Sequence, residues 1–310
     1  MTDHRPITVT LPEGVRCAIA LSYDTDMAGG YAPDGVCHGR TAPFLADYML
    51  RLCDTAEQFG ASLQFFQICN GLEPDQDVGY LLEILRRGHV VDSHTYSPVP
   101  LNTGDVAQLA EELALANRLL ADRLGVTSTV LRGPGGYARG LRGLPENQRV
   151  ILDSGFRWVS CEYSANLRSG DWDAAGINPS VDVPYAYDSG LIELPLQSWT
   201  DRSFFDTHQC VDPVAWDRFK AEWGHKPLPK DFRPEWTAPD ALERWIEYNL
   251  QVAEFVYDHR LLWVVCWHPY SHYVHDRGNR MLPALLEWAA SRPERAWVCT
   301  VRDACGMLSP

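Results

Sequence analysis

Short apolar runs alternate with amphipathic helical stretches along most of this 310-residue chain, and no other feature limits its fold as strongly. Residues 16–22 (RCAIALS) and 261–267 (LLWVVCW) have the continuous apolar character of strands buried on both faces. Residues 41–59 and 106–124 carry apolar side chains at helical spacing. Strands that alternate with helices form parallel sheets, because each helix returns the chain to the start of the next strand. The pattern therefore predicts an α/β fold whose parallel sheet is closed, or nearly closed, into a barrel.

The whole pattern predicts one domain over residues 1–310, since we find no break in composition and no internal repeat. Further strands are predicted at residues 62–69, 90–93, 129–132, 158–161, 191–195 and 297–301, and further helices at 78–87, 148–154, 241–259 and 281–290. The segment 201–239 is an excursion rich in Pro, Trp, Phe and charge. We expect it to cover a site or, through Trp216, Trp223 and Trp236, to form a subunit contact.

The composition excludes several classes of protein. With 27 Lys and Arg against 41 Asp and Glu, the net charge of −14 argues against binding to nucleic acid or to an anionic membrane. The nine cysteines are odd in number and show no Cys-x-x-Cys pair, which favours reduced thiols in a reducing compartment. The first residues lack the apolar segment of a signal peptide, so the expected location is cytoplasmic. The 11 Trp, 13 Tyr and 10 His favour a pocket for a planar or ring-shaped small molecule.

Polar clusters follow four of the predicted strands, at the barrel end where functional residues of such folds collect. They are Asp24-Thr25-Asp26, the sequence DSHTYS at 92–97 with His94, the sequence RGPGGY at 132–137 with Arg132, and HPYSHYVH at 268–275. Each of the first three has an ordinary structural explanation, as turn residues, a hydrogen-bonded histidine or a glycine-rich turn with a surface arginine. Three histidines within eight residues at 268–275 are harder to attribute to packing and favour a function.

The order of these four clusters resembles the polysaccharide deacetylase superfamily, also called the NodB-homology or carbohydrate esterase 4 superfamily. The sequences GHVVDSH at 88–94, DSGFRWVS at 153–160 and IELP at 192–195 support the resemblance, which runs from residue 16 to the C-terminus. The most similar branch is intracellular and contains peptidoglycan-deacetylase-like proteins and allantoinases that need no cofactor. The resemblance implies a distorted (β/α)7 barrel and hydrolysis of an amide, usually an N-acetyl group.

The resemblance also implies roles for individual residues. Asp24 matches the general base, Arg132 the residue that orients it, and His268 the general acid. Asp26 and His94 match the first two ligands of a divalent metal, commonly zinc. These roles are chemically coherent, because amide hydrolysis needs a base to activate water, stabilisation of the oxyanion and an acid for the departing nitrogen.

One position departs from the family. The third ligand is a histidine four residues after the second, and here that position holds Pro98. Either no metal binds, as in the allantoinase branch, or another residue completes the site, with His272 and His275 as candidates. Without a metal, the oxyanion needs backbone N–H groups or a protonated histidine, and the substrate must be a better electrophile than an acetamide, such as a cyclic amide or imide.

A small cytosolic substrate is therefore expected, either a cyclic amide or imide or an N-acyl compound, bound by a homo-oligomer. Residues expected to line its pocket are Tyr23, Tyr96, Pro134, Tyr137, Trp199 and Tyr270. Two other classes stay open. One is a catalytically silent binding protein on the same barrel. The other is an unrelated barrel enzyme such as a metal-dependent sugar isomerase, for which Glu162 and Glu193 are the spare acidic ligands.

Overall fold

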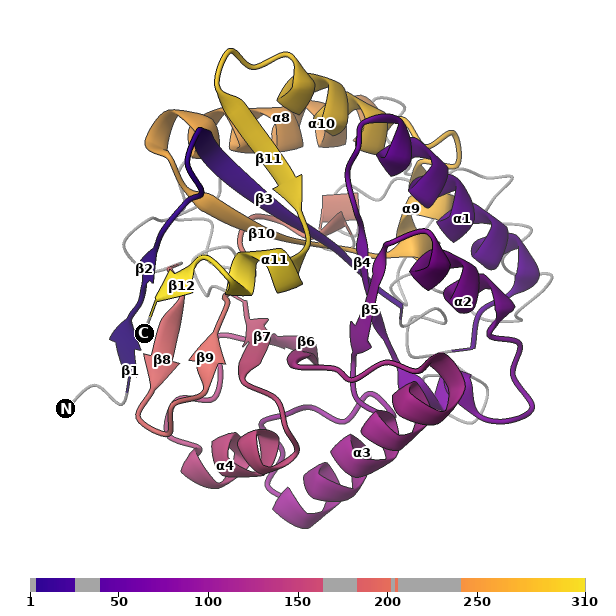
Figure 1. Ribbon diagram of the computed structural model, residues 1–310, viewed down its shortest axis with the longest axis vertical. Coiled ribbons are helices and arrows are strands. Elements are labelled where there is room, and N and C mark those ends of the chain that lie inside the picture. Colours follow the sequence, from indigo (N-terminus) through magenta and orange to yellow (C-terminus); the bar gives the residue numbers. More distant parts are fainter. Residues whose placement is uncertain (1–3, 26–39, 164–182, 202–203, 206–240, 310) are drawn as a thin grey trace.

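The computed structural model describes residues 4–25, 40–163, 183–201, 204–205 and 241–309 (Figure 1). Its strands are β1 (His4–Pro6), β2 (Thr8–Val9), β3 (Val15–Asp24), β4 (Gln64–Gln67), β5 (Val90–Ser93), β6 (Val130–Tyr137), β7 (Trp158–Glu162), β8 (Tyr185–Tyr187), β9 (Ile192–Glu193), β10 (Leu262–Trp267), β11 (Arg295–Cys299) and β12 (Leu308–Ser309). Its α-helices are α1 (Pro43–Gln58), α2 (Gly79–Arg86), α3 (Val106–Leu119), α4 (Pro145–Asp153), α8 (Ala241–His259), α9 (Pro269–His275), α10 (Met281–Ala290) and α11 (Val301–Cys305). Short turns of other helix types lie at Cys69–Leu72 and Leu120–Leu124.

The strands form one curved sheet in the order β1-β8-β9-β7-β6-β5-β4-β3-β10, with β11 also paired to β3. The neighbours from β9 to β10 run parallel, whereas β8 is antiparallel to both β1 and β9. The sheet curls round on itself in Figure 1, and after β9 the Gln197 N–H donates to the Val264 carbonyl on β10 at 3.2 Å. The predicted α/β barrel is confirmed.

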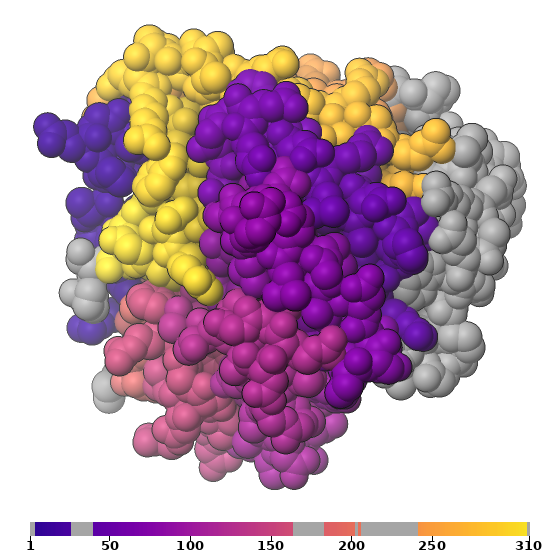
Figure 2. All heavy atoms as spheres, turned by 45° about the vertical axis from the view of Figure 1, so that its right-hand side comes forward, coloured from indigo at the N-terminus to yellow at the C-terminus, as the bar shows by residue number. Residues whose placement is uncertain are grey.

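The two ends of the described chain lie side by side. Strand β12 is antiparallel to β2, with Leu308 opposite Val9. C-terminal residues, in yellow, accordingly adjoin the indigo N-terminal strands in both Figure 1 and Figure 2. No helix in the described ranges is long and apolar enough to span a membrane.

The predicted strands and helices are all present, with shifted ends, but several short elements were not predicted. Residues 133–137 continue β6 instead of forming a loop, and the histidine-rich stretch at 268–275 is mostly the helix α9. Five other elements were missed: β1, β2, β8, α11 and β12. Each has five residues or fewer, which is too short for a periodic pattern to appear in the sequence. Most of the 201–239 excursion, with its three tryptophans, lies outside the described residues.

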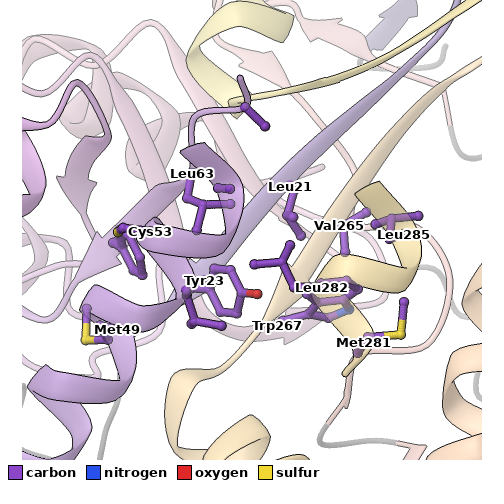
Figure 3. Close-up of a cluster of buried hydrophobic side chains, with 14 of the residues drawn as sticks. Leu21, Tyr23, Met49, Cys53, Leu63, Val265, Trp267, Met281, Leu282 and Leu285 are labelled. Carbon is purple, nitrogen blue, oxygen red and sulfur yellow. The ribbon is translucent and has the colours of Figure 1, made fainter. Parts of the chain in front are cut away.

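The side-chain alternation of β3 and β10 separates two environments. Leu21 and Tyr23 on β3, like Val265 and Trp267 on β10, point toward the surrounding helices and pack with side chains of α1 and α10 (Figure 3). The intervening residues face the barrel interior, because successive side chains of a strand point to opposite sides. Ser22, Asp24 and Cys266 are therefore on the interior side of the sheet.

Helix α11 closes the barrel at the end where the strands begin. The Arg302 backbone N–H donates to Gln64 at the start of β4, and the Arg302 guanidinium makes two hydrogen bonds to Asp92, at 2.7 and 3.2 Å. Ser128 and Gln64 also donate to Asp92, which is fully buried. Burial raises the pKa of Asp92, although Arg302 opposes that shift. Asp92, within the sequence cluster that includes His94, thus has a structural role at the opposite end.

The glycines of β6 face neighbouring side chains. A Cβ atom added to Gly133 would stand 2.7 Å from the Cys161 Cβ and 3.0 Å from a Leu101 methyl group. We therefore expect Gly133→Ala to lower the free energy of unfolding by about 1–3 kcal/mol through overpacking. Chemical denaturation measures the loss, with Gly104→Ala as control, since a Cβ there meets nothing within 4 Å. Equal stabilities of the two variants would contradict this account of β6.

Candidate active site

Asp24 is the last residue of β3 and lies inside the barrel, 5% exposed. The Arg132 Nη1 donates to its Oδ1 at 3.2 Å, and Arg132 Nη2 donates to Ser22 at 2.9 Å. The guanidinium also lies over the Phe66 ring, with its central carbon 4.5 Å from the ring centroid. Arg132 is itself fully buried, so it can hardly reorient, and it fixes one carboxylate oxygen of Asp24.

His94 follows β5 and is aimed at the other oxygen of Asp24. Its Nδ1 is 2.9 Å from the Arg132 carbonyl, which only accepts, so Nδ1 carries a proton. Its Nε2 then faces Asp24, 3.7 Å from Oδ2. A histidine held in this way can bind a metal through Nε2 when neutral, or donate from Nε2 when protonated.

Cys266 is a member of this group that the sequence did not single out. Its thiol, on β10, donates to Asp24 Oδ2 at 3.2 Å. Burial, together with the charge of Asp24, raises the pKa of the Cys266 thiol well above its usual value. The residue is therefore a neutral thiol in the structure, and it helps to hold Asp24 in place.

His268 approaches from β10, at the start of α9. Its ring Nδ1 is 2.8 Å from Asp201 Oδ1, and its backbone N–H donates to Asp201 Oδ2 at 2.9 Å. Asp201 is fully buried. Burial raises the pKa of Asp201. The charge and hydrogen bonds of His268, together with the charge of His272, lower that pKa by a larger amount, so the net shift is downward. Asp201 thereby orients the His268 ring with Nδ1 toward itself and Nε2 away from it.

His272 and His275 occupy different surroundings. The His272 ring is fully buried between Tyr23 and Trp267, with centroid distances of 5.6 and 4.9 Å, and its Nε2 is 3.7 Å from Asp201 Oδ2. Burial lowers the pKa of His272. His275 stacks on Phe205 at 4.1 Å. The structure brings neither of them into the group around Asp24.

The residues expected to line a substrate pocket are dispersed. Tyr96 follows β5 and lines a polar pocket, and the Tyr270 ring is 5.7 Å from that of His268. Tyr23 is in the layer between sheet and helices, because it faces away from Asp24 (Figure 3). Tyr137 donates to the Pro134 carbonyl and accepts from the Leu101 N–H, so it braces β6.

Trp199, the remaining pocket candidate, packs edge-on against Phe204 at 6.3 Å.

A polar pocket of about 340 Å³ lies beside the ends of β4 and β5. Its lining includes Arg40, Asn70, Glu73, Asp75, Gln76, Tyr96 and Ser97. The Tyr96 hydroxyl donates to Glu73 at 3.0 Å. Tyr96 follows His94 by two residues, so this pocket opens at the same end of the barrel as the candidate site.

The described residues do not assemble the expected set of three metal ligands. Pro98 has no donor atom in its side chain, Asp26 lies outside the described residues, and only His94 is suitably placed. A different group, Asp24, Cys266 and His268, has donor atoms that all lie within 4.8 Å of one another. Within the described part of the chain it is the one group of three or more such side chains.

Glu162 and Glu193, the acidic ligands that a sugar isomerase would need, form hydrogen bonds and ion pairs away from Asp24. Glu193 is fully buried and accepts hydrogen bonds from the backbone of Cys161 and Glu162 and from the Tyr187 hydroxyl. Burial raises the pKa of Glu193. Glu162 pairs with Arg142. Neither glutamate belongs to the group of potential metal ligands.

Sequence reasoning missed two residues of the site. Cys266 precedes His268 by two positions, and the alternation of side chains along a strand could have placed both on one face. Asp201 has no such signal, because it follows β9 outside every predicted strand and helix, and its place depends on the tertiary structure.

Comparisons with known proteins support the fold and identify a family similarity. The family model described as "Polysaccharide deacetylase" matches residues 19–141, the part that contains Asp24, His94 and Arg132. No curated protein matches the sequence. Among solved structures, a Mycobacterium smegmatis protein assigned as a polysaccharide deacetylase is 20% identical, with a TM-score of 0.64 over 99% of this chain and 94% of its own.

Two further solved structures share the fold. The Puue allantoinase is 16% identical, with a TM-score of 0.58 over 96% of this chain and 91% of its own. The chitin deacetylase of the fungus Colletotrichum lindemuthianum is 14% identical, with a TM-score of 0.52 over 97% and 91%. The chain thus has the barrel fold of NodB-type deacetylases, and its residues 19–141 match the family model of the polysaccharide deacetylases, a family of hydrolases that act on carbon–nitrogen amide bonds.

Proposed function

We propose that the protein hydrolyses an amide bond of a small molecule, by opening a cyclic amide or imide or by removing an N-acyl group. In this proposal Asp24 is the general base and His268 the general acid. The observation that carries it is the closeness of these two groups at the ends of the adjacent strands β3 and β10, with donor atoms within 4.8 Å. Each is held by its own buried charge, Asp24 by Arg132 and His268 by Asp201.

The geometry assigns each proton transfer to a stated atom. Arg132 holds Oδ1 of Asp24, which leaves Oδ2 to take the proton of an attacking water. Asp201 holds Nδ1 of His268, so Nε2 delivers the proton to the departing nitrogen. Because both helpers are buried, the two reacting groups keep their orientation during the reaction.

His94 is the proposed partner of the oxyanion. Its Nδ1 is tied to the Arg132 carbonyl, so in the protonated ring Nε2 donates into the space beside Asp24. A divalent metal would supply the same stabilisation in related enzymes, but the described residues do not complete that ligand set. A single cationic donor, protonated His94, stabilises the oxyanion less than a metal together with further donors. The site therefore favours substrates whose carbonyl is already electrophilic, such as cyclic imides.

The volume of one pocket and the net charge of the protein support a small substrate. The polar pocket beside Tyr96 measures about 340 Å³, near the lower limit of small-molecule sites. The net charge of −14 disfavours anionic polymers. A protein with the same fold is an allantoinase, which shows that this barrel is not restricted to polysaccharides. We further propose that the protein is cytoplasmic, because its cysteines show no pairing pattern, and that it is a homo-oligomer, because the segment 201–239 is rich in aromatic residues.

A substrate panel tests this proposal. Cyclic imides, ureides, N-acetyl sugars and N-acetylated polysaccharide are each incubated with the wild-type protein and with His268→Gln, and products are identified by mass spectrometry. We expect turnover of a small cyclic or N-acyl compound that is strongly reduced in His268→Gln. Faster hydrolysis of the polymer would overturn the small-substrate proposal. Tight binding of one compound without any turnover would instead identify a silent binding protein.

A further inference from the structure

We propose that Asp24, Cys266 and His268 form a binding site for a thiophilic divalent cation, represented by zinc, and that this cation blocks the hydrolase. The binding site stands on geometry alone. The block also rests on the proposed function, because it assumes that Asp24 and His268 are the base and the acid. The site differs from the ligand set implied by the sequence resemblance, with which it shares no residue.

The three donor atoms are close enough to share one ion. They lie within 4.8 Å of one another, and Cys266 Sγ is 3.2 Å from Asp24 Oδ2. A zinc ion bound at about 2.3 Å to sulfur and about 2.0 Å to nitrogen and oxygen has ligands roughly 3–4 Å apart. Rotamer adjustments of about 1 Å therefore suffice to bring the third donor into range. All three side chains are buried, so no large surface rearrangement is needed.

Neighbouring groups already orient the ligands as metal sites require. Arg132 occupies Oδ1 of Asp24, so the carboxylate would bind through Oδ2, the oxygen nearest to Cys266. Asp201 holds Nδ1 of His268, which is the usual arrangement of a carboxylate behind a metal-binding histidine. His94, with Nε2 3.7 Å from Asp24 Oδ2, borders the remaining side of the site.

The sulfur ligand determines which cations fit. A cysteine binds as the thiolate, so its proton passes to solvent as the cation enters. The thiolate and the Asp24 carboxylate then balance the two charges of the ion. Thiolate and imidazole ligands select zinc and similar soft ions, whereas magnesium and calcium prefer oxygen ligands alone.

Binding at this site removes both proton-transfer groups at once. The lone pair of Asp24 Oδ2 that would accept the proton of water is donated to the cation. The ring nitrogen of His268 that would carry the proton to the leaving group is likewise a ligand. The cation is therefore an inhibitor, in contrast to a metal that leaves the base and acid available.

Direct binding measurements on the whole protein test the site. Zinc is titrated against a chromophoric chelator, and cobalt is added separately to look for thiolate-to-cobalt charge-transfer absorption in the near ultraviolet. We expect one ion per chain and the charge-transfer band. In Cys266→Ser the band should vanish, and zinc affinity should fall by at least about 10- to 100-fold, the loss seen even when an outer partner of a metal ligand is removed.

The matched control is Cys299→Ser, another buried thiol of the sheet, on strand β11, which should retain the band and the affinity. Retention of the band and of tight zinc binding in Cys266→Ser would overturn the proposed site.

Zinc should also inhibit turnover of any substrate found, and a chelator should reverse the inhibition. If zinc activates the enzyme while the band depends on Cys266, the site stands and the block is refuted. If no substrate is found, this result counts against the proposed function and not against the metal site, because zinc and cobalt binding are measured without any substrate.

Discussion

The Asp24→Asn variant is expected to lose about 10²- to 10⁴-fold in kcat/KM, the range that a positioned general base contributes. Asparagine has nearly the same shape and can still accept from Arg132 at Oδ1, but the anionic Oδ2, the proposed acceptor of the proton of water, is replaced by an amide. Initial rates on the best substrate of the panel measure the loss. Chemical denaturation of the same variant shows whether the fold is retained.

Asp92→Asn is the matched control for this substitution. Asp92 is also a buried carboxylate of the barrel interior held by an arginine, but its partner Arg302 lies at the opposite end. We expect it to lower stability while kcat changes by a few-fold at most. Hydrolysis undiminished in Asp24→Asn would refute the general-base role, whatever the control shows.

Asp201→Asn is expected to lower kcat by about 10²- to 10⁴-fold, the scale set by a buried carboxylate that orients a catalytic histidine. Asp201 uses both oxygens, one for the His268 ring and one for the His268 backbone N–H. An asparagine offers one oxygen, so one of the two donors loses its acceptor. KM should change little, since Asp201 is fully buried and acts through His268. Steady-state kinetics separates kcat from KM.

The pH dependence of stability gives Asp201 a second test. Its pKa lies below the value near 3.9 of an unfolded chain, so the ionised carboxylate stabilises the folded state. This contribution is complete above about pH 4 and is lost as the pH falls through the lowered pKa. The difference in unfolding free energy between wild type and Asp201→Asn should therefore shrink below about pH 4.

Asp276→Asn is the control, because Asp276 is a buried acid that caps α10, accepting from the N–H groups of Arg280 and Met281. It should reduce stability and spare kcat. An Asp201→Asn enzyme whose kcat equals that of Asp276→Asn would show that Asp201 has only a structural role.

Much of the barrel could be predicted because its long elements carry strong patterns. The strands at 16–22 and 261–267 and the helix at 106–124 bury continuous or periodic apolar faces, and each was found. The short elements could not be predicted, and α9 shows why. Its seven residues include Pro269 at the first turn, and it is helical because the chain must turn back against α1 after β10. Local preference contributes little at that length.

Part of the candidate site could be predicted for the same reason, the strong patterns of the long strands. Asp24 and His268 adjoin the ends of strong strand patterns, so their place at one end of the barrel followed from the parallel order. Tyr23 was assigned to the pocket although it adjoins Asp24, and the alternation of β3 turns it toward α1 and α10 instead (Figure 3). That assignment neglected the two-residue period of the strand.

The sequence by itself determined the alternating α/β order, the acidic net charge, and the carboxylate and imidazole groups available for chemistry. It determined them because apolar periodicity and side-chain type are local properties of the chain. Only the tertiary structure decided which groups meet. It placed Cys266 against Asp24 and Asp201 against His268, across 242 and 67 residues of chain. Such contacts depend on strand register and on the path of irregular segments, which no local pattern encodes.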